Sequence, residues 1–412
     1  MTRTGAPILR NRTGKLKQWV MNRVRAALPG LFAAFRRLWP IAKIGSVHVV
    51  TLHDDVREVL LTDKAFKVPY AKKLVVLMEG HEAFIGMQDT DAYRSQLGRL
   101  ESLARPEDMD WLADATEQRA EAIVAASGGR LEVVDTLFRT VTFDILEDYF
   151  GVTKPEIGDM RIWSTRMFEY QFLGSDESLY EEIEWMAPAL LRHIEDIIEK
   201  RRASGDFSQK DLLGRALALQ QQGEKGWDDL FIRTMLSALV IGGPPQPPMV
   251  LPQALEQLLR RPDALASAQK AAREPDEALT FGHIFEALRF DPISPILPRE
   301  ATCDCVIAQG TKRSHKVAKG DKVLAAIQSA MSDPRRIPSP GSFIPTRQPH
   351  EYLHFGLGLH ECFGRHINRA MFPAICAPLL RRKNLRRAKR PAGKLAYEGF
   401  FPASLTVVFD KD

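Results

Sequence analysis

A single cysteine lies in the stretch of the chain that is best placed to do chemistry. Residues 354–365 read His-Phe-Gly-Leu-Gly-Leu-His-Glu-Cys-Phe-Gly-Arg, so Cys362 is flanked by glycines that permit tight turns. The residues that follow, Ile367, Ala370 and Met371, have the spacing of one apolar helix face. The pattern predicts a cysteine on a loop that opens a helix, where the positive end of the helix dipole favours the thiolate. A lone buried thiolate of this kind can bind haem iron from one side.

The same stretch resembles the cysteine-ligand loop of the cytochrome P450 superfamily, whose pattern is Phe-x-x-Gly-x-[His/Arg]-x-Cys-x-Gly. The matching positions are Phe355, Gly358, His360, Cys362 and Gly364. The resemblance implies a mainly α-helical fold with small β-sheets, a triangular helical prism that encloses haem b. It also implies that Cys362 is the ligand of the haem iron and that Phe355 and Gly364 contact the cofactor. A structural cysteine beside a helix start is the alternative reading.

Companion motifs of the same superfamily occur in the expected order. Glu286 and Arg289 resemble its Glu-x-x-Arg pair, which locks the core to the loop before the cysteine; at i, i+3 the two side chains share one helix face and can bridge. Arg299 resembles the arginine that reaches a haem propionate. Tyr93 takes the position of a propionate-binding histidine. As candidate propionate ligands we rank His360 first, Arg299 second and Tyr93 third.

The segment expected on the other side of the haem departs from the superfamily, which usually carries an acid followed by Thr or Ser there. Residues 240–249 read Val-Ile-Gly-Gly-Pro-Pro-Gln-Pro-Pro-Met. Gly243 takes the glycine position, Pro245 the acid position and Gln246 the alcohol position. The usual pair relays protons during dioxygen activation, a general-acid task that proline cannot perform and an amide performs poorly.

The prolines of this segment also bear on its conformation. Each proline removes a backbone donor and costs about 3 kcal/mol at an interior helix position. We therefore expect the long helix to be interrupted here, with carbonyls exposed above the haem.

These features lead to a hypothesis about the reaction. An enzyme that receives its O–O bond in a peroxide does not need the proton-relay pair, as in peroxygenases and in hydroperoxide isomerases or dehydratases of the superfamily. Gln246 would orient the peroxide by a hydrogen bond, with Gly243 and Pro245 shaping the site. Two alternatives stay open. One is a redox-partner-dependent monooxygenase that uses a water relay, and the other is a haem-binding or sensor protein without turnover.

The substrate pocket is expected to come from loops around residues 68–86, 165–180, 230–250 and 291–297. Their apolar content favours a hydrophobic substrate, such as a lipid or a terpenoid-like molecule. The apolar candidates are Leu74, Val75, Leu77, Met78, Phe84, Met167, Phe168, Phe172, Ile293 and Ile296.

Composition agrees with a single large haem domain. The chain has 412 residues, 45% of them hydrophobic, and no apolar run long enough for a membrane span. Its four cysteines form neither a disulfide framework nor a zinc site, which favours a reducing compartment. We expect a cytoplasmic protein, with peripheral attachment to a membrane surface as an alternative that the N-terminus suggests. The periodicity predicts helices over residues 179–202 and 228–240, and strands near 44–51, 301–308 and 397–409. Residues 133–151 resemble the central helix of the superfamily, so we expect a helix there as well.

Residues 1–43 form a candidate N-terminal arm before a haem-thiolate domain over residues 44–412. No Asp or Glu precedes Asp54, whereas Lys and Arg are frequent and interleave with Trp, Phe, Leu and Val. Over residues 9–40 this is the composition of a helix at a membrane interface, with a break at Pro29-Gly30 dividing it in two. The alternative is a surface helix packed on the haem domain.

A second basic run covers residues 381–390, after the helix that Cys362 opens. It suits either a solvated turn or a docking patch for an acidic electron donor of the ferredoxin type, since the superfamily usually takes electrons on the cysteine side. The run lacks interleaved aromatic residues, so we expect no nucleic-acid partner.

Overall fold

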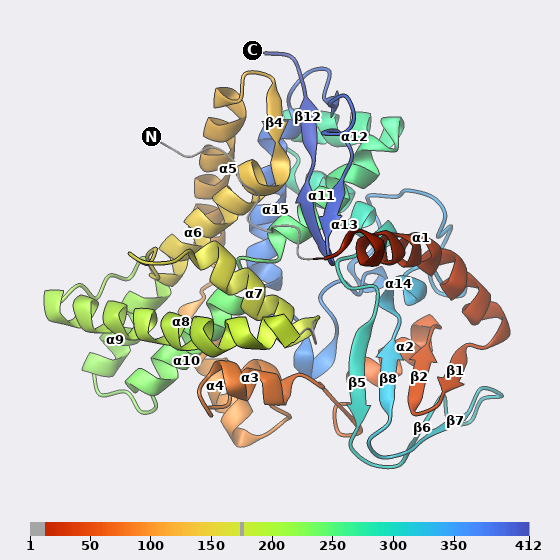
Figure 1. The fold of residues 1–412 in the computed structure, drawn as a ribbon, viewed down its shortest axis with the longest axis horizontal. Helices are drawn as coiled ribbons and strands as arrows, with labels where there is room; N and C mark the ends of the chain where they lie inside the picture. Colours follow the sequence, from red (N-terminus) through yellow and green to blue (C-terminus); the bar gives the residue numbers. More distant parts are fainter. Residues whose placement is uncertain (1–12, 174–176, 412) are drawn as a thin grey trace.

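The computed structural model describes residues 13–173 and 177–411, and helices dominate it (Figure 1). In chain order the helices are α1 (Lys15–Leu38), α2 (His53–Leu61), α3 (Ala71–Leu77), α4 (Asp91–Leu103), α5 (Asp108–Ala126), α6 (Thr140–Phe150), α7 (Met160–Phe172), α8 (Glu177–Ser204), α9 (Leu212–Gln221), α10 (Asp229–Gly242), α11 (Pro247–Leu259), α12 (Pro262–Arg273), α13 (Glu277–Phe290), α14 (Ile327–Ala330) and α15 (Arg365–Leu380). Short 3-10 turns form η1 (Phe84–Gly86), η3 (Pro349–Glu351) and η4 (Gly358–His360), and a π-helical segment forms η2 (Val133–Arg139).

Small sheets complete the fold. The strands are β1 (Ile41–Ile44), β2 (Val47–Val50), β3 (Phe66–Lys67), β4 (Arg130–Glu132), β5 (Leu297–Ala301), β6 (Cys305–Ile307), β7 (His315–Val317), β8 (Lys322–Ala325), β9 (Arg386–Arg387), β10 (Ala396–Glu398), β11 (Phe401–Ser404) and β12 (Thr406–Val408). The largest sheet has the order β1-β2-β8-β5-β3 and lies at the right of Figure 1, under α1. Within it β2 and β8 pair in parallel, with Val47 opposite Lys322, and the other pairs are antiparallel.

Helix starts follow from local chemistry. Asp228 accepts a hydrogen bond from the backbone N–H of Phe231 at the start of α10, and Asp276 accepts one from Leu279 at the start of α13. Such caps satisfy backbone donors that the first helical turn leaves unpaired. These caps fix the first residues of α10, which ends at the proline-rich segment, and of α13, which carries Glu286 and Arg289.

The core is continuous through the helical part of the molecule. Its largest fully buried apolar side chains include Phe138, Phe143, Tyr149 and Phe150. Helix α15, which follows the candidate cysteine, packs along α5 and also contacts α12 and α13. A second apolar cluster fills the space between the largest sheet, α2 and α14. The cysteine loop therefore rises from the best-packed part of the fold.

Two expectations about local structure were wrong in detail. Residues 133–150 are not one regular helix, because the first seven form the wider π-helical segment, with the carboxylate of Glu132 accepting from the N–H groups of Val134 and Asp135. Pro29 does not divide the arm, because α1 is continuous from Lys15 to Leu38. A single interior proline removes one helical hydrogen bond and the helix can continue beyond it.

The boundary expected after residue 43 falls inside β1, which pairs with β2 in the largest sheet. The division into an arm and a haem domain thus stays a proposal, with α1 as the arm's described part. No helix among the described residues is long and apolar enough to cross a bilayer.

Candidate active site

The loop that carries Cys362 is held in shape by its glycines and by one backbone bond. Cys362 lies between η4 and α15, and its N–H donates to the carbonyl of Phe355 at 2.8 Å. Gly356 and Gly358 both have φ of +71°, a left-handed conformation that other residues rarely adopt. A Cβ added to Gly358 would lie 3.1 Å from the carbonyl oxygen of Leu60. The spacing of glycines that the sequence singles out is thus a steric requirement of this turn.

Burial controls the thiol of Cys362 more than the helix start does. Burial raises the pKa of this thiol to about 11, although a hydrogen bond from the N–H of Gly364 and the charge of Arg365 act in the opposite direction. Part of the residue is accessible, yet the sulfur itself is closely surrounded by protein. The start of the helix acts in the expected direction, through the N–H of Gly364, but in the metal-free chain burial outweighs it. A thiolate here needs a nearby cation, which is what a haem iron supplies.

Glu286 and Arg289 form the centre of a buried network, and both are fully buried. The guanidinium of Arg289 donates to both carboxylate oxygens of Glu286, at 2.8 and 2.9 Å. Arg347 donates to the same carboxylate at 3.1 Å, as does the hydroxyl of Tyr352 at 3.1 Å, and the N–H of Ile344 adds a bond of 3.0 Å. The network joins α13 to the segment before the cysteine loop, so it fixes the loop's position relative to the core.

Sequence reasoning found the Glu286–Arg289 pair but missed the roles of Arg347 and Tyr352. The pair has a local signal, since its members lie three residues apart on one helix. Arg347 and Tyr352 lie 61 and 66 residues from Glu286, so only the fold brings them together.

Arg299 and His360 meet at the candidate propionate site. Arg299, on β5, is 5% exposed, and its hydrogen bond goes to the carbonyl of the adjacent Pro298. No carboxylate among the described residues forms an ion pair with it. Burial and the charge of Arg299 lower the pKa of His360 to about 4, so the two groups lie within electrostatic reach. A buried guanidinium without a counter-ion is costly, and a haem propionate would supply that counter-ion. The residues present therefore fit the carboxylate edge of a haem.

Tyr93 supports the cysteine loop from α4. Its hydroxyl donates to the carbonyl of Leu359 at 2.6 Å, which uses its only donor. A ring nitrogen of His360 lies 3.2 Å from the side-chain oxygen of Gln88, a second contact that the sequence did not indicate. The proposed contact of Tyr93 with the haem is thus better stated as indirect, through the loop.

Tyr70 is a further member of the site that sequence reasoning did not name. Burial raises the pKa of its hydroxyl to about 12, while Arg299 lowers it and Cys362 raises it. Tyr70 therefore lies within electrostatic reach of both the candidate iron ligand and the candidate propionate ligand. Its ring packs edge-on against Phe172, with 4.8 Å between ring centroids. No motif marks it, because it sits in a segment recognisable only as apolar.

The break between α10 and α11 confirms the expected interruption of the long helix. Helix α10 ends at Gly242 and α11 begins at Pro247. The side-chain amide of Gln246 donates to the carbonyl of Gly242 at 2.5 Å, and its backbone N–H donates to the carbonyl of Gly243 at 3.1 Å. The carbonyls of Gly242 and Gly243 are thus bound within the chain. For these two carbonyls the expectation that they stand exposed above the haem was wrong, because Gln246 binds both.

The prolines at this break are placed where they cost little. Pro247 and Pro248 occupy the first positions of α11, where a helix leaves N–H groups unbonded in any case, and Pro244 and Pro245 lie in the turn before it. The cost of about 3 kcal/mol per interior proline therefore does not apply to them.

The short turn η1 contacts both sides of the site. Ile85 lies 4.0 Å from the position a Cβ on Gly242 would take, and otherwise the space there is open. The neighbouring ring of Phe84 packs against Phe363, which follows Cys362, with 6.0 Å between ring centroids. The helix break and the cysteine loop thus face the same short segment.

A small apolar cluster lies next to these groups. Its buried members are Phe168 of α7, Met249 of α11 and Phe401 of β11, and Phe172, Leu173 and Ile293 pack against them. Three of the apolar residues expected to line a substrate pocket meet here: Phe168, Phe172 and Ile293. Leu74, Leu77, Met78 and Met167 are buried in the main core instead. Through Phe172 and Tyr70 the cluster connects to the candidate haem site.

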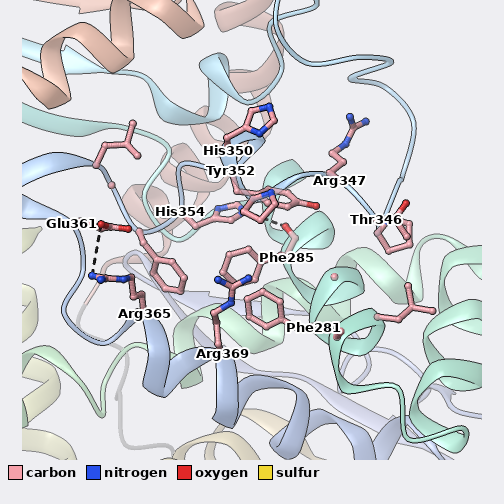
Figure 2. A pocket seen from close by; sticks show the side chains of 18 of the residues that line it. Phe281, Phe285, Thr346, Arg347, His350, Tyr352, His354, Glu361, Arg365 and Arg369 are labelled. Carbon is pink, nitrogen blue, oxygen red and sulfur yellow. Dashed lines mark hydrogen bonds and ion pairs between the residues drawn. The ribbon is translucent and has the colours of Figure 1, made fainter. Parts of the chain in front are cut away.

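A cavity of about 730 Å³ opens on the cysteine side, between the cysteine loop, α13 and the segment around Pro345. Figure 2 shows Arg369 beside Phe281 and Phe285, and Arg365 in an ion pair with Glu361. Arg57 also lines it, and the Arg369 guanidinium lies 5.1 Å from the ring centroid of Phe281. The cavity is therefore lined both by aromatic rings, including Phe281 and Phe285, and by guanidinium groups.

The basic run at residues 381–390 is partly used inside the fold. Arg381 forms an ion pair with Glu117, and Arg382 and Arg387 pair with Glu121 and Glu256. Arg381 and Arg382 tie the end of α15 to α5, and Arg387 ties β9 to α11.

Comparisons with known proteins agree with this site. The sequence pattern that defines the family described as Cytochrome P450 matches residues 164–391. A steroid C26-monooxygenase of Mycolicibacterium smegmatis is 27% identical over 304 residues, which is 73% of this chain and 70% of that protein. A bifunctional dioxygenase–epoxy alcohol synthase of Pyricularia oryzae is 32% identical over 131 residues, 32% of this chain but 11% of that protein. The crystal structure of P450BioI in complex with a fatty-acid-ligated acyl carrier protein has a TM-score of 0.80 at 19% identity, covering 95% of this chain and 100% of that one.

The fold and these similarities define a class, that of haem-thiolate proteins whose cofactor is haem b. The chain belongs to the cytochrome P450 family. Residues 240–249 contain neither an acid nor a Thr or Ser, which is the pair that the sequence comparison leads us to expect in that segment. The chain spans only about a tenth of the length of the fungal relative.

Proposed function

We propose that this chain is a haem-thiolate enzyme that oxidises or rearranges a hydrophobic substrate with a peroxide as its source of oxygen. The observation that carries the proposal is the helix break, at which Gln246 binds the carbonyl of Gly242 and no acid–alcohol pair stands between Gly242 and Pro248. A peroxygenase reaction converts R–H and H₂O₂ into R–OH and water. A hydroperoxide isomerase conserves every atom of its substrate. Neither reaction needs electrons or protons from outside.

Each residue has a distinct part in the proposed reaction. When bound, the haem supplies the iron chemistry that cleaves the O–O bond, and Cys362 is its proposed ligand. Arg299 and His360 hold the propionates, and the network around Glu286 keeps the cysteine loop in place. Gln246 retains one amide hydrogen and its side-chain oxygen after binding Gly242, so it can still orient a peroxide by a hydrogen bond.

The substrate class follows from the apolar cluster around Phe168, Met249 and Phe401. These side chains suit a lipid or a terpenoid-like molecule and offer few hydrogen-bond partners. The fungal relative is named for epoxy alcohol synthesis, and an epoxy alcohol is an isomer of an unsaturated hydroperoxide. A fatty-acid hydroperoxide is therefore the probe that we would use first.

A reductant-driven monooxygenase is the second candidate, favoured by the monooxygenase of Mycolicibacterium smegmatis that matches 73% of this chain. The cavity on the cysteine side, with Arg57, Arg365 and Arg369, suits an acidic electron donor of the ferredoxin type. In this reading a water would have to replace the missing alcohol. A protein that only senses or carries haem has no observation in its favour.

The test is anaerobic mixing of the ferric holoenzyme with hydrogen peroxide and, separately, with a fatty-acid hydroperoxide, without a reductant. Rapid formation of oxygenated or rearranged product supports the proposal. Gln246→Ala should lower the rate about tenfold or more by removing a positioned donor, whereas Gln221→Ala, on the exposed end of α9, should not change it. A haem that does not react, or that only bleaches, would contradict the peroxide proposal and favour reductant-driven oxygenation.

A further inference from the structure

Helix α1 is attached to the rest of the molecule along one face. Phe32 is buried, and Gln18 exchanges hydrogen bonds with the backbone of Gly399, at 2.7 and 3.3 Å. Arg25 donates to the carbonyl of Phe400 at 3.0 Å, and its guanidinium lies 3.9 Å from the ring centroid of Tyr397. These contacts fix α1 on the hairpin of β10 and β11. Figure 1 shows α1 above the largest sheet.

The opposite face of α1 is apolar and exposed. Leu16, Val20, Val24, Leu31 and Leu38 lie four or seven residues apart, so they form one stripe along the helix. Seven of the sixteen large apolar side chains exposed among the described residues lie on α1 or directly after it: Leu16, Trp19, Val20, Val24, Leu31, Leu38 and Trp39. Such a concentration marks an interaction surface.

Charge selects the kind of partner. No Asp or Glu occurs before Asp54, while α1 carries Lys15, Lys17, Arg23, Arg25, Arg36 and Arg37. Arg23 lies next to Trp19, its guanidinium 5.2 Å from the ring centroid, so cation and aromatic ring stand together at the edge of the stripe. An apolar stripe bordered by cations and tryptophans matches the boundary between acyl chains and anionic headgroups.

The surface also adjoins the candidate substrate pocket. Phe400, at the turn of the hairpin that α1 holds, is 51% exposed. The next residue, Phe401, is buried in the apolar cluster with Phe168 and Met249. The hairpin thus connects the attached face of α1, which lies opposite the apolar stripe, with the apolar cluster across two neighbouring residues.

We propose that α1 docks this enzyme on an anionic lipid bilayer, with its apolar stripe in the interface. The β10–β11 hairpin, on the other face of the helix, is thereby held roughly one helix diameter from the lipid, so that a membrane-dissolved substrate enters the apolar cluster beside the hairpin. The evidence for docking comes from the residues of α1 alone. The delivery step rests on the proposed function, because it assumes that the cluster around Phe401 binds the substrate.

The docking is tested with the full-length holoenzyme and sedimented vesicles. One set of vesicles is phosphatidylcholine, and the other is an equal mixture of phosphatidylcholine and phosphatidylglycerol. We expect binding to the mixed vesicles, weaker binding to the neutral ones, and a loss of binding as salt is added. The triple variant Val20→Ser/Val24→Ser/Leu31→Ser should bind at least tenfold more weakly. Arg23→Gln/Arg37→Gln should weaken binding to the anionic vesicles alone.

A matched control keeps the test specific to α1. Trp111, Ile157 and Leu230 are also exposed apolar residues but lie elsewhere, so their replacement by Ser should leave vesicle binding unchanged. Wild-type protein that stays in the supernatant with anionic vesicles overturns the proposal, as does equal binding by the α1 triple variant. Lipid-free dimers that the triple variant dissociates would assign the stripe to a second copy of the chain and would also overturn it.

The delivery step has its own measurement. A fatty-acid hydroperoxide is offered either in the anionic vesicles or dissolved as monomers in buffer, and binding is followed by the change in haem absorbance. The α1 triple variant should respond about tenfold more slowly to the vesicle-borne substrate and normally to the dissolved one. An equal response to both overturns delivery. Because binding and vesicle sedimentation are measured apart from product formation, failure of the peroxide chemistry would not be mistaken for failure of docking.

Discussion

Burial favours the neutral thiol of Cys362, whereas a haem iron would favour its thiolate. These opposing effects predict that haem binding releases a proton. Burial raises the thiol pKa to about 11, so the metal-free chain carries a neutral thiol at physiological pH. Iron binds the thiolate, and the proton must leave. We therefore expect reconstitution with haem at pH 8 to release about one proton from Cys362, and the affinity to rise about tenfold per pH unit below the thiol pKa.

Calorimetry in buffers of different ionisation enthalpy measures that proton directly. Cys362→Ala is the control and should abolish both the release and the pH dependence. Affinity that is independent of pH in the wild-type chain would show that the thiolate exists before the haem arrives.

Glu286 gives a second prediction at the scale of single residues. Its carboxylate is shared by Arg289 and Arg347, all three fully or almost fully buried. Arg347→Met leaves part of a buried charge uncompensated, which should destabilise the holoenzyme by about 3 kcal/mol and reduce its haem content. Urea unfolding and haem per chain are the measurements.

The matched control for this prediction is Arg335→Met. Arg335 belongs to the same segment and pairs with Asp333, but its side chain is 56% exposed. Solvent screens such a pair, so the loss should stay near or below about 1 kcal/mol. Equal losses in the two variants would mean that Arg347 acts as an ordinary surface cation.

At the scale of elements, the start of α11 explains how a proline-rich segment is tolerated beside an active site. Pro247 stands at a helix N-terminus, so Pro247→Ala should change the free energy of unfolding by no more than about 0.5 kcal/mol. Ala254→Pro, in the interior of the same helix, should cost about 3 kcal/mol or more. If Pro247→Ala instead stabilises the protein by several kcal/mol, the helix break is strained. Urea unfolding of both variants distinguishes these outcomes.

How far the sequence predicts these elements depends on how local their signals are. The glycines around Cys362, the i, i+3 spacing of Glu286 and Arg289, and the prolines after Gly243 all act over a few residues, and the expected loop, pair and interruption occur where they were placed. The contacts of Tyr93 with Leu359 and of Gln88 with His360 span 266 and 272 residues. No local pattern encodes such contacts, so the sequence could name Tyr93 but not its partner.

The exact position of the helix boundary was the other source of error. The proline run predicts a break, but the free-energy cost of Pro247 and Pro248 depends on whether they lie inside a helix or at its start. A shift of a few residues decides that, and tertiary packing sets it. For the same reason Gln246 could be expected near the site while its bond to Gly242 could not.

At the scale of the whole molecule, the cavity beside the cysteine loop is a candidate docking site for an electron donor. The cysteine side opens to the cavity with Arg57 and Arg369. If an acidic electron donor docks there, Arg57→Gln/Arg369→Gln should raise the KM for a reduced ferredoxin about tenfold at low salt, and less at high salt. Steady-state kinetics at two ionic strengths provide the measurement.

The basic run near the end of α15 supplies the control surface for that experiment. Arg386→Gln/Lys389→Gln removes two cations from the run, and the KM for the donor should not change. If this second variant weakens docking more than the first, the run and not the cavity is the donor site.

The carboxylate of Glu286 has a consequence for how the molecule assembles. Its partners Ile344, Arg347 and Tyr352 lie 58, 61 and 66 residues away from it along the chain. Closing a chain segment of that length is slow compared with forming a helix, since its entropy must be lost before the contacts reward it. The cysteine loop cannot take its final position until that closure is complete. We therefore expect α13 and α15 to form early during folding and the haem to be captured late, by a nearly finished chain.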